Sequence, residues 1–133
     1  MNLNRPLSFF LLVLISLPAI AQRQNLKFRH LDINAGLSQN NVRCILQDSK
    51  GFMWFGTRDG LNKYDGYKFT VYKYAAKDKY SISSNHITDI KEHADGFIWV
   101  GTRGGGLNRY DREKERFNRF LAQPGIENTI SSD

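Results

Sequence analysis

Two arginines spaced 45 residues apart are the side chains of this sequence best suited to bind a ligand. Arg58 and Arg103 each follow a Gly-Thr pair in closely similar surroundings. A guanidinium group binds a carboxylate or a sulfate through two parallel hydrogen bonds, so such a pair fits an acidic sugar. The alternative for both arginines is a solvated side chain or an ion pair with Asp59 or Asp65.

Aromatic side chains are a second source of binding chemistry, because a flat ring can stack on a sugar. Tyr64 and Tyr110 lie at strand ends and are the better candidates for such stacking. Trp54 and Trp99 lie inside apolar segments, where we expect them to pack in a core. The candidate ligand-binding residues are therefore Arg58, Arg103, Tyr64 and Tyr110.

Catalytic and metal-binding patterns are absent from the sequence. His30, His86 and His93 lack the spacing of metal ligands, and the single cysteine, Cys44, excludes a disulfide within the chain. We find no nucleophile elbow, zinc-protease motif or phosphate-binding loop. We expect no metal site, no cofactor and no enzymatic activity in this chain.

Composition indicates a folded protein. The chain has 133 residues, of which 41% are hydrophobic and 24% charged, which excludes wholesale disorder. The formal net charge is +6. In a cytosolic protein such a balance would favour a search for nucleic acid.

The first 21 residues are typical of an export signal. Arg5 supplies the basic start, residues 7–17 are almost wholly apolar, and Ala19 and Ala21 fit a cleavage site. The alternative, a membrane anchor, would need ~20 apolar residues. Cleavage would remove one arginine and leave a charge of +5 outside the cytoplasm, where acidic glycans and lipid headgroups are the available polyanions. We therefore expect no nucleic-acid partner.

An internal repeat dominates the rest of the chain. Gly51–Arg58 returns as Gly96–Arg103 with six of eight residues identical at a shift of 45. Residues 61–65 return as 107–111, and residues 130–133 begin a third copy. A period of this length is typical of propellers and other repeat arrays.

Each repeat contains four short segments with β character, separated by turn residues. The predicted strands are residues 41–47, 52–57, 61–64 and 68–74 in the first unit and 86–92, 97–102, 107–110 and 116–121 in the second. Four strands in about 45 residues make one propeller blade. The predicted fold is all-β, a partial β-propeller of four-stranded antiparallel blades.

The repeat also predicts how the chain is divided. We expect a signal peptide at 1–21, a stray outer strand and connecting loop at 22–36, blade 1 at 37–81, blade 2 at 82–129 and the start of a third repeat at 130–133. Phe28–Leu31 is the candidate for the stray strand, which would be the fourth strand of a blade whose other three strands are missing.

The second strand of each unit is apolar on both faces, which indicates cover on both sides. Adjacent blades would supply that cover. The predicted structural core of the repeat consists of Trp54, Trp99, Gly56, Gly101, Thr57 and Thr102.

The turns and the first strand leave finer questions open. Asp48–Gly51 fits a turn capped by its aspartate, whereas His93–Gly96 places Asp beside Gly and favours a different turn. The charged loop 111–115 is expected to protrude into solvent. In the first strand the apolar Val42 and Ile45 are three residues apart, which indicates either a bulge or a strand that starts late.

Three segments and their second copies carry a resemblance to a known family. They are Gly36–Ser38, Asp48–Thr57 and Asp59–Gly66. The sequence resembles the regulator-propeller repeats in the periplasmic part of hybrid two-component histidine kinases of Bacteroidetes, and the resemblance covers nearly all of residues 26–133. It implies paired propellers, a downstream membrane span and a kinase core, of which this chain would be the N-terminal fragment.

The resemblance also implies a function. Such sensors bind oligosaccharides, so we expect a periplasmic ligand-sensing propeller whose partners are an oligosaccharide and the remaining blades of the same protein. It further implies a homodimer of the full-length sensor, anchored in the inner membrane by a downstream span. The alternative is a fragment of a secreted carbohydrate-active enzyme or binding module built on a propeller.

Overall fold

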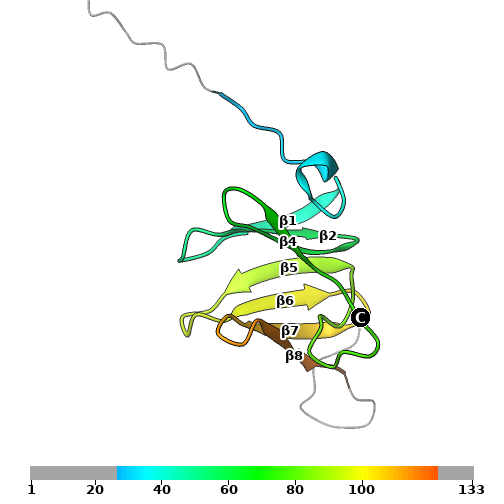
Figure 1. The fold of residues 1–133 in the computed structure, drawn as a ribbon. Coiled ribbons are helices and arrows are strands. Elements are labelled where there is room, and N and C mark those ends of the chain that lie inside the picture. Colours follow the sequence, from blue (N-terminus) through cyan, green and yellow to red (C-terminus); the bar gives the residue numbers. More distant parts are fainter. Residues whose placement is uncertain (1–26, 123–133) are drawn as a thin grey trace, which may run out of the picture.

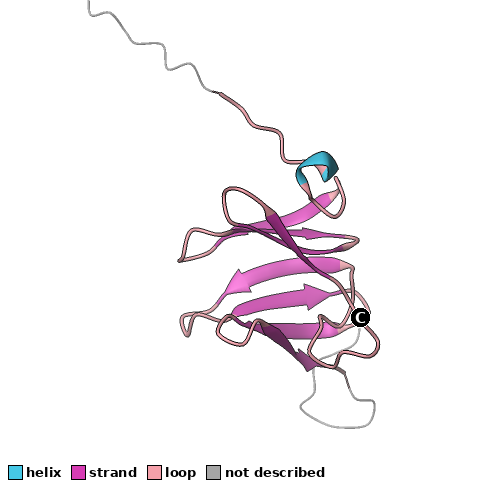
Figure 2. Ribbon diagram, viewed as in Figure 1, coloured by secondary structure: helices cyan, strands magenta, loops and turns pink. Residues whose placement is uncertain are grey.

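The computed structural model describes residues 27–122, and these fold almost entirely as β-strands (Figure 2). The expected signal peptide and the third repeat lie outside the described residues. One short 3-10 helix, η1 (Ile33–Ala35), precedes eight strands. Within the described part, no helix has the length and apolar character needed to cross a membrane.

The eight strands form two four-stranded antiparallel sheets in simple sequential order. The first sheet contains β1 (Val42–Gln47), β2 (Met53–Thr57), β3 (Gly60–Tyr64) and β4 (Phe69–Tyr72). The second contains β5 (Ile87–Glu92), β6 (Ile98–Thr102), β7 (Gly106–Asp111) and β8 (Arg116–Phe120). This is the predicted partial propeller, with each repeat forming one blade.

Both sheets share the same irregularity at the start of their first strand. Val42 pairs with Thr57 and Cys44 with Gly56, so Arg43 is the extra residue of a β-bulge. In the second sheet the register shifts in the same way between Ile87 and Asp89. Of the two alternatives left by the sequence, the bulge is therefore the correct one.

The two sheets are stacked with β5 beside the first sheet (Figure 1). Their backbones approach most closely between β5 and the strands β1 and β2. The main core lies between the sheets and includes Trp54, Leu61, Ile82, Ile87, Ile90, Ile98, Val100, Tyr110 and Phe117. Burying this surface is the main force that holds adjacent blades together.

Trp54 is the largest fully buried side chain of this core. Its ring stacks on Tyr72 at a centroid distance of 6.1 Å and meets the edge of Tyr110 at 5.3 Å. Its indole Nε1 donates a 2.6 Å hydrogen bond to Asp48. The buried indole is thus satisfied, as a tryptophan in a core requires.

A buried polar cluster recurs in both blades and ties the segment before the first strand of each sheet to the second and third strands. In blade 1 the Asn62 side chain exchanges hydrogen bonds with the backbone N–H and hydroxyl of Ser38, at 2.8 and 2.9 Å. The Ser38 hydroxyl also lies 2.9 Å from that of Thr57. In blade 2 the same bonds join Asn108, Ser83 and Thr102.

The turn between β1 and β2 and its counterpart between β5 and β6 are alike, contrary to the sequence expectation. In both, the glycine N–H donates to the carbonyl three residues back, from Gly51 to Asp48 and from Gly96 to His93. Both glycines have positive φ, at 86° and 83°. The expectation of two turn types was wrong because the backbone is fixed by the glycine, whatever residue carries the capping side chain.

The expected outer strand at Phe28–Leu31 is not paired within the described residues. Phe28 is 85% exposed, and no sheet includes this segment. A strand forms only against a partner, and none of the described strands pairs with this segment. Asp32 instead caps η1, accepting hydrogen bonds from the backbone of Asn34 and Ala35.

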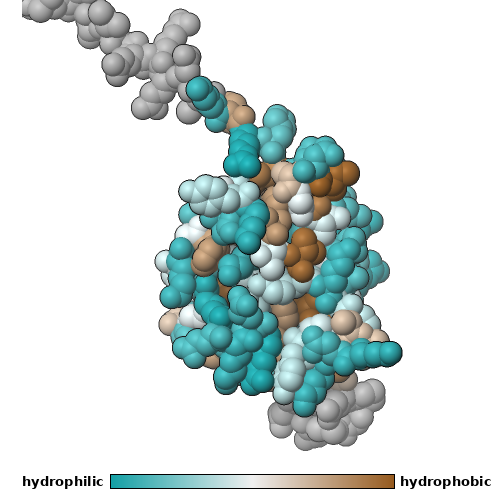
Figure 3. All heavy atoms as spheres, in the orientation of Figure 1, coloured by the Kyte–Doolittle hydropathy of each residue, from teal (hydrophilic) through white to brown (hydrophobic). Residues whose placement is uncertain are grey.

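The side of blade 1 away from blade 2 carries a second apolar cluster. It contains Leu37, Phe55 and Tyr64, with Leu31, Val42, Met53 and Phe69 packed around them. Apolar surface is visible over the first sheet in Figure 3. The equivalent residues of blade 2 face blade 1 across the main core. The outer side of blade 1 therefore has the character of a blade interface.

Candidate functional site

Arg58 and Arg103 lie at the same end of their sheets, as the repeat predicts. Arg58 follows β2 and Arg103 follows β6, and both are exposed. The residues leading into β5 connect the two positions. Asn85 accepts a 2.8 Å hydrogen bond from the Gly60 N–H, and His86 accepts one of 2.9 Å from the Arg103 N–H.

Arg43 and His86 join the two arginines at this end. Arg43 is the bulged residue of β1 and is exposed, and His86 directly precedes β5. Partial desolvation lowers the pKa of His86, and the charges of Arg43, Arg103 and Arg58 lower it further. We call the four residues Arg43, Arg58, His86 and Arg103 the basic rim.

The positive charge of the basic rim is not neutralised within the described residues. Among residues 27–122, none of its arginines forms an ion pair, and none of their side chains makes a hydrogen bond to the protein. The nearby Asp59 pairs instead with Lys73 at 2.8 Å. Asp59 is thus not the partner of Arg58, one of the alternatives raised by the sequence.

The two tyrosines proposed for ligand stacking are buried. Tyr110 is 1% exposed and lies between the blades, where its hydroxyl is 2.8 Å from that of Tyr72. Tyr64 is 9% exposed, packs on Phe69 and donates a hydrogen bond to the Gly66 carbonyl. Neither ring presents a face to a ligand here, because both rings pack in apolar clusters. Both hydroxyls are hydrogen-bonded within the protein.

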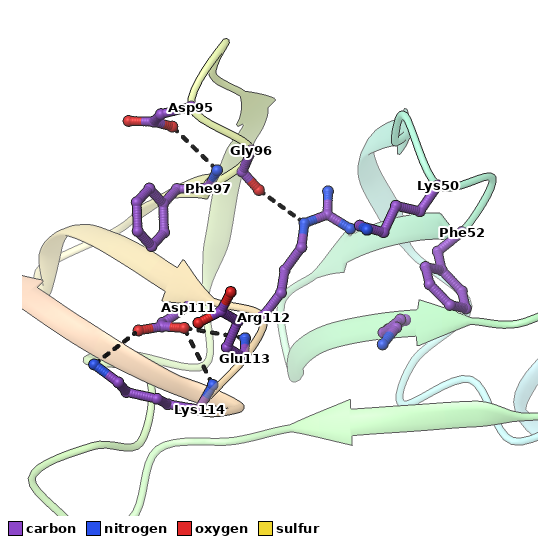
Figure 4. A pocket seen from close by; sticks show the side chains of 10 residues that line it. Lys50, Phe52, Asp95, Gly96, Phe97, Asp111, Arg112, Glu113 and Lys114 are labelled. Atoms are coloured by element: carbon purple, nitrogen blue, oxygen red, sulfur yellow. Dashed lines mark hydrogen bonds and ion pairs between the residues drawn. The ribbon is translucent and has the colours of Figure 1, made fainter.

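A pocket of about 690 Å³ lies at the opposite end of the strands (Figure 4). Phe52 and Phe97, equivalent residues of the two blades, line it together with residues of the loop after β7. Its charges are mixed, and the full lining is Lys50, Phe52, Lys63, Asp95, Gly96, Phe97, Asp111, Arg112, Glu113 and Lys114.

Arg112 lies in this pocket, and each of its three guanidinium nitrogens already donates a hydrogen bond. Its guanidinium donates to Asp48 at 2.8 Å, to Glu92 at 2.7 Å and to the Gly96 carbonyl at 2.8 Å. The group therefore joins the two blades. Loop 111–115 was expected to protrude, and Glu113, Lys114 and Glu115 are exposed, but Arg112 turns inward.

The residues predicted as the repeat core occupy different environments in the two blades. Trp54 is fully buried, whereas Trp99 is half-buried and packs on Phe120 at 5.4 Å. Thr57 and Thr102 both belong to the polar clusters. A side chain at Gly56 would meet the Cys44 sulfur of its own blade and, at 2.7 Å, Ile87 of blade 2. One at Gly101 would meet Thr88 of its own blade at 3.0 Å and the Asp89 backbone at 3.8 Å.

Other reactive groups in the described residues do not form a site. No group of three or more potential ligands is placed to hold a metal ion between residues 27 and 122. Cys44 is half-buried, and burial raises the pKa of its thiol to about 11. The thiol is therefore protonated and unreactive at neutral pH.

Comparison with known families agrees with the architecture. The family model described as "Two component regulator propeller" matches residues 36–59 and 81–104. Each match begins just before the Leu-Ser or Ile-Ser pair of a polar cluster and ends just after the arginine of the basic rim.

Individual relatives are sensor proteins. Histidine kinase P4 of Formosa agariphila is 44% identical over 82 residues, which are 59% of this chain and 6% of that protein. The extracellular domain of BT3049 from B. thetaiotaomicron, described as a hybrid two component system, is 34% identical with a TM-score of 0.71. The match covers 78% of this chain and 14% of that one.

A second solved structure gives the same result. The extracellular domain of BT4673 from B. thetaiotaomicron, also described as a hybrid two component system, is 27% identical with a TM-score of 0.60. The match covers 80% of this chain and 15% of that one. The chain thus spans a small part of each relative.

Proposed function

We propose that this chain, which carries two repeats of the two component regulator propeller family, contributes two blades to the oligosaccharide-sensing ectodomain of a two-component sensor. The observation that carries the proposal is the pair of family repeats folded as adjacent blades, together with 34% identity to a sensor ectodomain. In this proposal the ectodomain lies in the periplasm and further blades cover the apolar sides of blades 1 and 2.

The proposal gives the two ends of the blades different roles. Arg58 and Arg103 bind ligand, while the Asp48, Arg112 and Glu92 network keeps the blades in register. Signalling belongs to the full-length sensor, which we propose to be a homodimer anchored in the inner membrane. This chain contributes binding and no catalysis.

Isothermal titration of the ectodomain that contains this chain, against a panel of neutral and acidic oligosaccharides, tests the proposal. We expect saturable binding of at least one oligosaccharide, which is recovered unchanged afterwards. Absence of binding across the panel would overturn the proposal. Conversion of the sugar during incubation would favour the alternative, a propeller-scaffold enzyme.

A further inference from the structure

The basic rim brings together three arginines and one histidine from three separate parts of the chain. Arg43 comes from the bulge of β1, Arg58 from the turn after β2, and His86 with Arg103 from blade 2. The sequence singled out only the two arginines that share a repeat position. Arg43 has no arginine counterpart in blade 2, where the bulged residue is Thr88.

The backbone holds the rim in a fixed arrangement. The hydrogen bond from Gly60 to Asn85 ties the turn that carries Arg58 to blade 2, and the bond from Arg103 to His86 ties the two rim residues of blade 2. A β-bulge commonly re-aims the side chain of its extra residue, here Arg43. The three guanidinium groups are therefore carried on positions that are fixed before a ligand binds.

Charge distinguishes the rim from the pocket at the other end of the blades. In the pocket, Arg112 is already paired with Asp48 and Glu92, and carboxylates are as prominent as lysines. In the rim, three arginines without carboxylate partners among the described residues lie near one histidine. Gathering like charges costs free energy, which an anion would recover by binding there.

Resting on the proposed function, we infer that Arg43, Arg58, His86 and Arg103 form a single anion-binding site that selects sugars bearing a carboxylate or a sulfate. The guanidinium groups accept the anion as planar, bidentate donors. The imidazole adds one further N–H donor when neutral. An uncharged sugar leaves the arginines unneutralised, so it binds less tightly at this site.

Three ligands of one length that differ only at C6 test the inference by titration of the ectodomain: a galactose oligosaccharide, its 6-sulfated form and a galacturonic acid oligosaccharide. We expect at least one acidic form to bind about tenfold more tightly than the neutral form, with an advantage that shrinks as NaCl is raised. The arm that binds more tightly identifies sulfate or carboxylate as the preferred group.

Arg43→Ala is the decisive variant because Arg43 lies on an exposed position outside the core. It should weaken binding of the preferred acidic sugar about three- to tenfold and leave thermal unfolding unchanged. The matched control, Lys50→Ala, removes one charge at the opposite end of the strands and should leave affinity unchanged. Equal affinity for all three ligands, or equal effects of both variants, would overturn the inference while leaving oligosaccharide sensing intact. Silence in all three arms would overturn the inference, and the broader panel would still decide on oligosaccharide sensing.

Discussion

Asp48 connects the turn, the core and the neighbouring blade through one carboxylate. One oxygen accepts hydrogen bonds from the backbone of Lys50 and Phe52, each at 3.0 Å. The other accepts from the Trp54 indole and the Arg112 guanidinium. With all these donors in place, a carboxylate that is only 4% exposed is fully compensated.

Replacing Asp48 should therefore destabilise the blade pair strongly. Asp48→Ala removes four hydrogen bonds and leaves the Trp54 N–H without its partner, so we expect a loss of about 3 kcal/mol. Asp95→Ala, in the equivalent turn of blade 2, removes an exposed carboxylate and should cost less than about 1 kcal/mol. Urea unfolding followed by tryptophan fluorescence measures both, and equal losses would contradict the assigned role.

Asp48 should also make stability depend on acid. Burial alone would raise the pKa of this carboxyl, but the hydrogen bonds from Trp54 and Arg112 outweigh it and hold the pKa below the ordinary 3.8. The carboxylate therefore stabilises the fold above about pH 4, and this contribution is lost as pH falls through the lowered pKa. Asp48→Asn should show a smaller loss of stability between pH 4 and pH 2 than the unaltered protein.

At the residue scale the sequence predicted the local capping role of Asp48 better than the long-range contacts of side chains. Asp48 was expected to cap its turn, which it does. Its pairing with Arg112 was missed because the two residues are 64 positions apart and Arg112 belongs to a charged loop that was expected to lie in solvent. The burial of Tyr110 was missed for a similar reason, since a strand-end position does not reveal that the neighbouring blade covers the ring.

At the scale of the element, the same strand meets two different settings. β2 and β6 share the Trp-x-Gly-Thr pattern, but blade 2 covers β2 on the side of Trp54, and no described residue covers β6 in the same way. The strands themselves were predictable from alternation and turn residues, to within two residues at most ends. The register shift was foreseen only as one of two alternatives, because a bulge and a late start give the same apolar spacing.

Alanine substitutions at Gly56 and Gly101, the equivalent glycines of β2 and β6, test this difference between the two strands. Gly56→Ala would bring a methyl group against the Cys44 sulfur of its own sheet and to 2.7 Å from Ile87 at the blade interface, so we expect a loss of about 2 kcal/mol. Gly101→Ala would meet the Thr88 side chain at 3.0 Å and the Asp89 backbone at an ordinary 3.8 Å, and should cost less than about 1 kcal/mol. Comparable thermal unfolding shifts for the two variants would mean that Gly56 is not crowded by Cys44 and Ile87 as described.

At the scale of the whole molecule, the two blades are repeats with one shared interface, and the outer side of blade 1 also has interface character. Tyr64, Phe55 and Leu37 on blade 1 occupy the positions that Tyr110, Val100 and Ile82 use to contact it from blade 2. The propeller architecture could be predicted from the 45-residue period. The charge of the basic rim could be predicted only in part, because Arg43 joins it through the tertiary fold.

The structure of the ectodomain bound to a saturating acidic oligosaccharide tests the central proposal most directly. We predict that the carboxylate or sulfate of the sugar contacts the guanidinium groups of Arg58 and Arg103, with Arg43 within hydrogen-bonding reach. A sugar seated instead in the pocket between Phe52 and Phe97, or away from these two blades, would contradict the assignment of the basic rim as the ligand site.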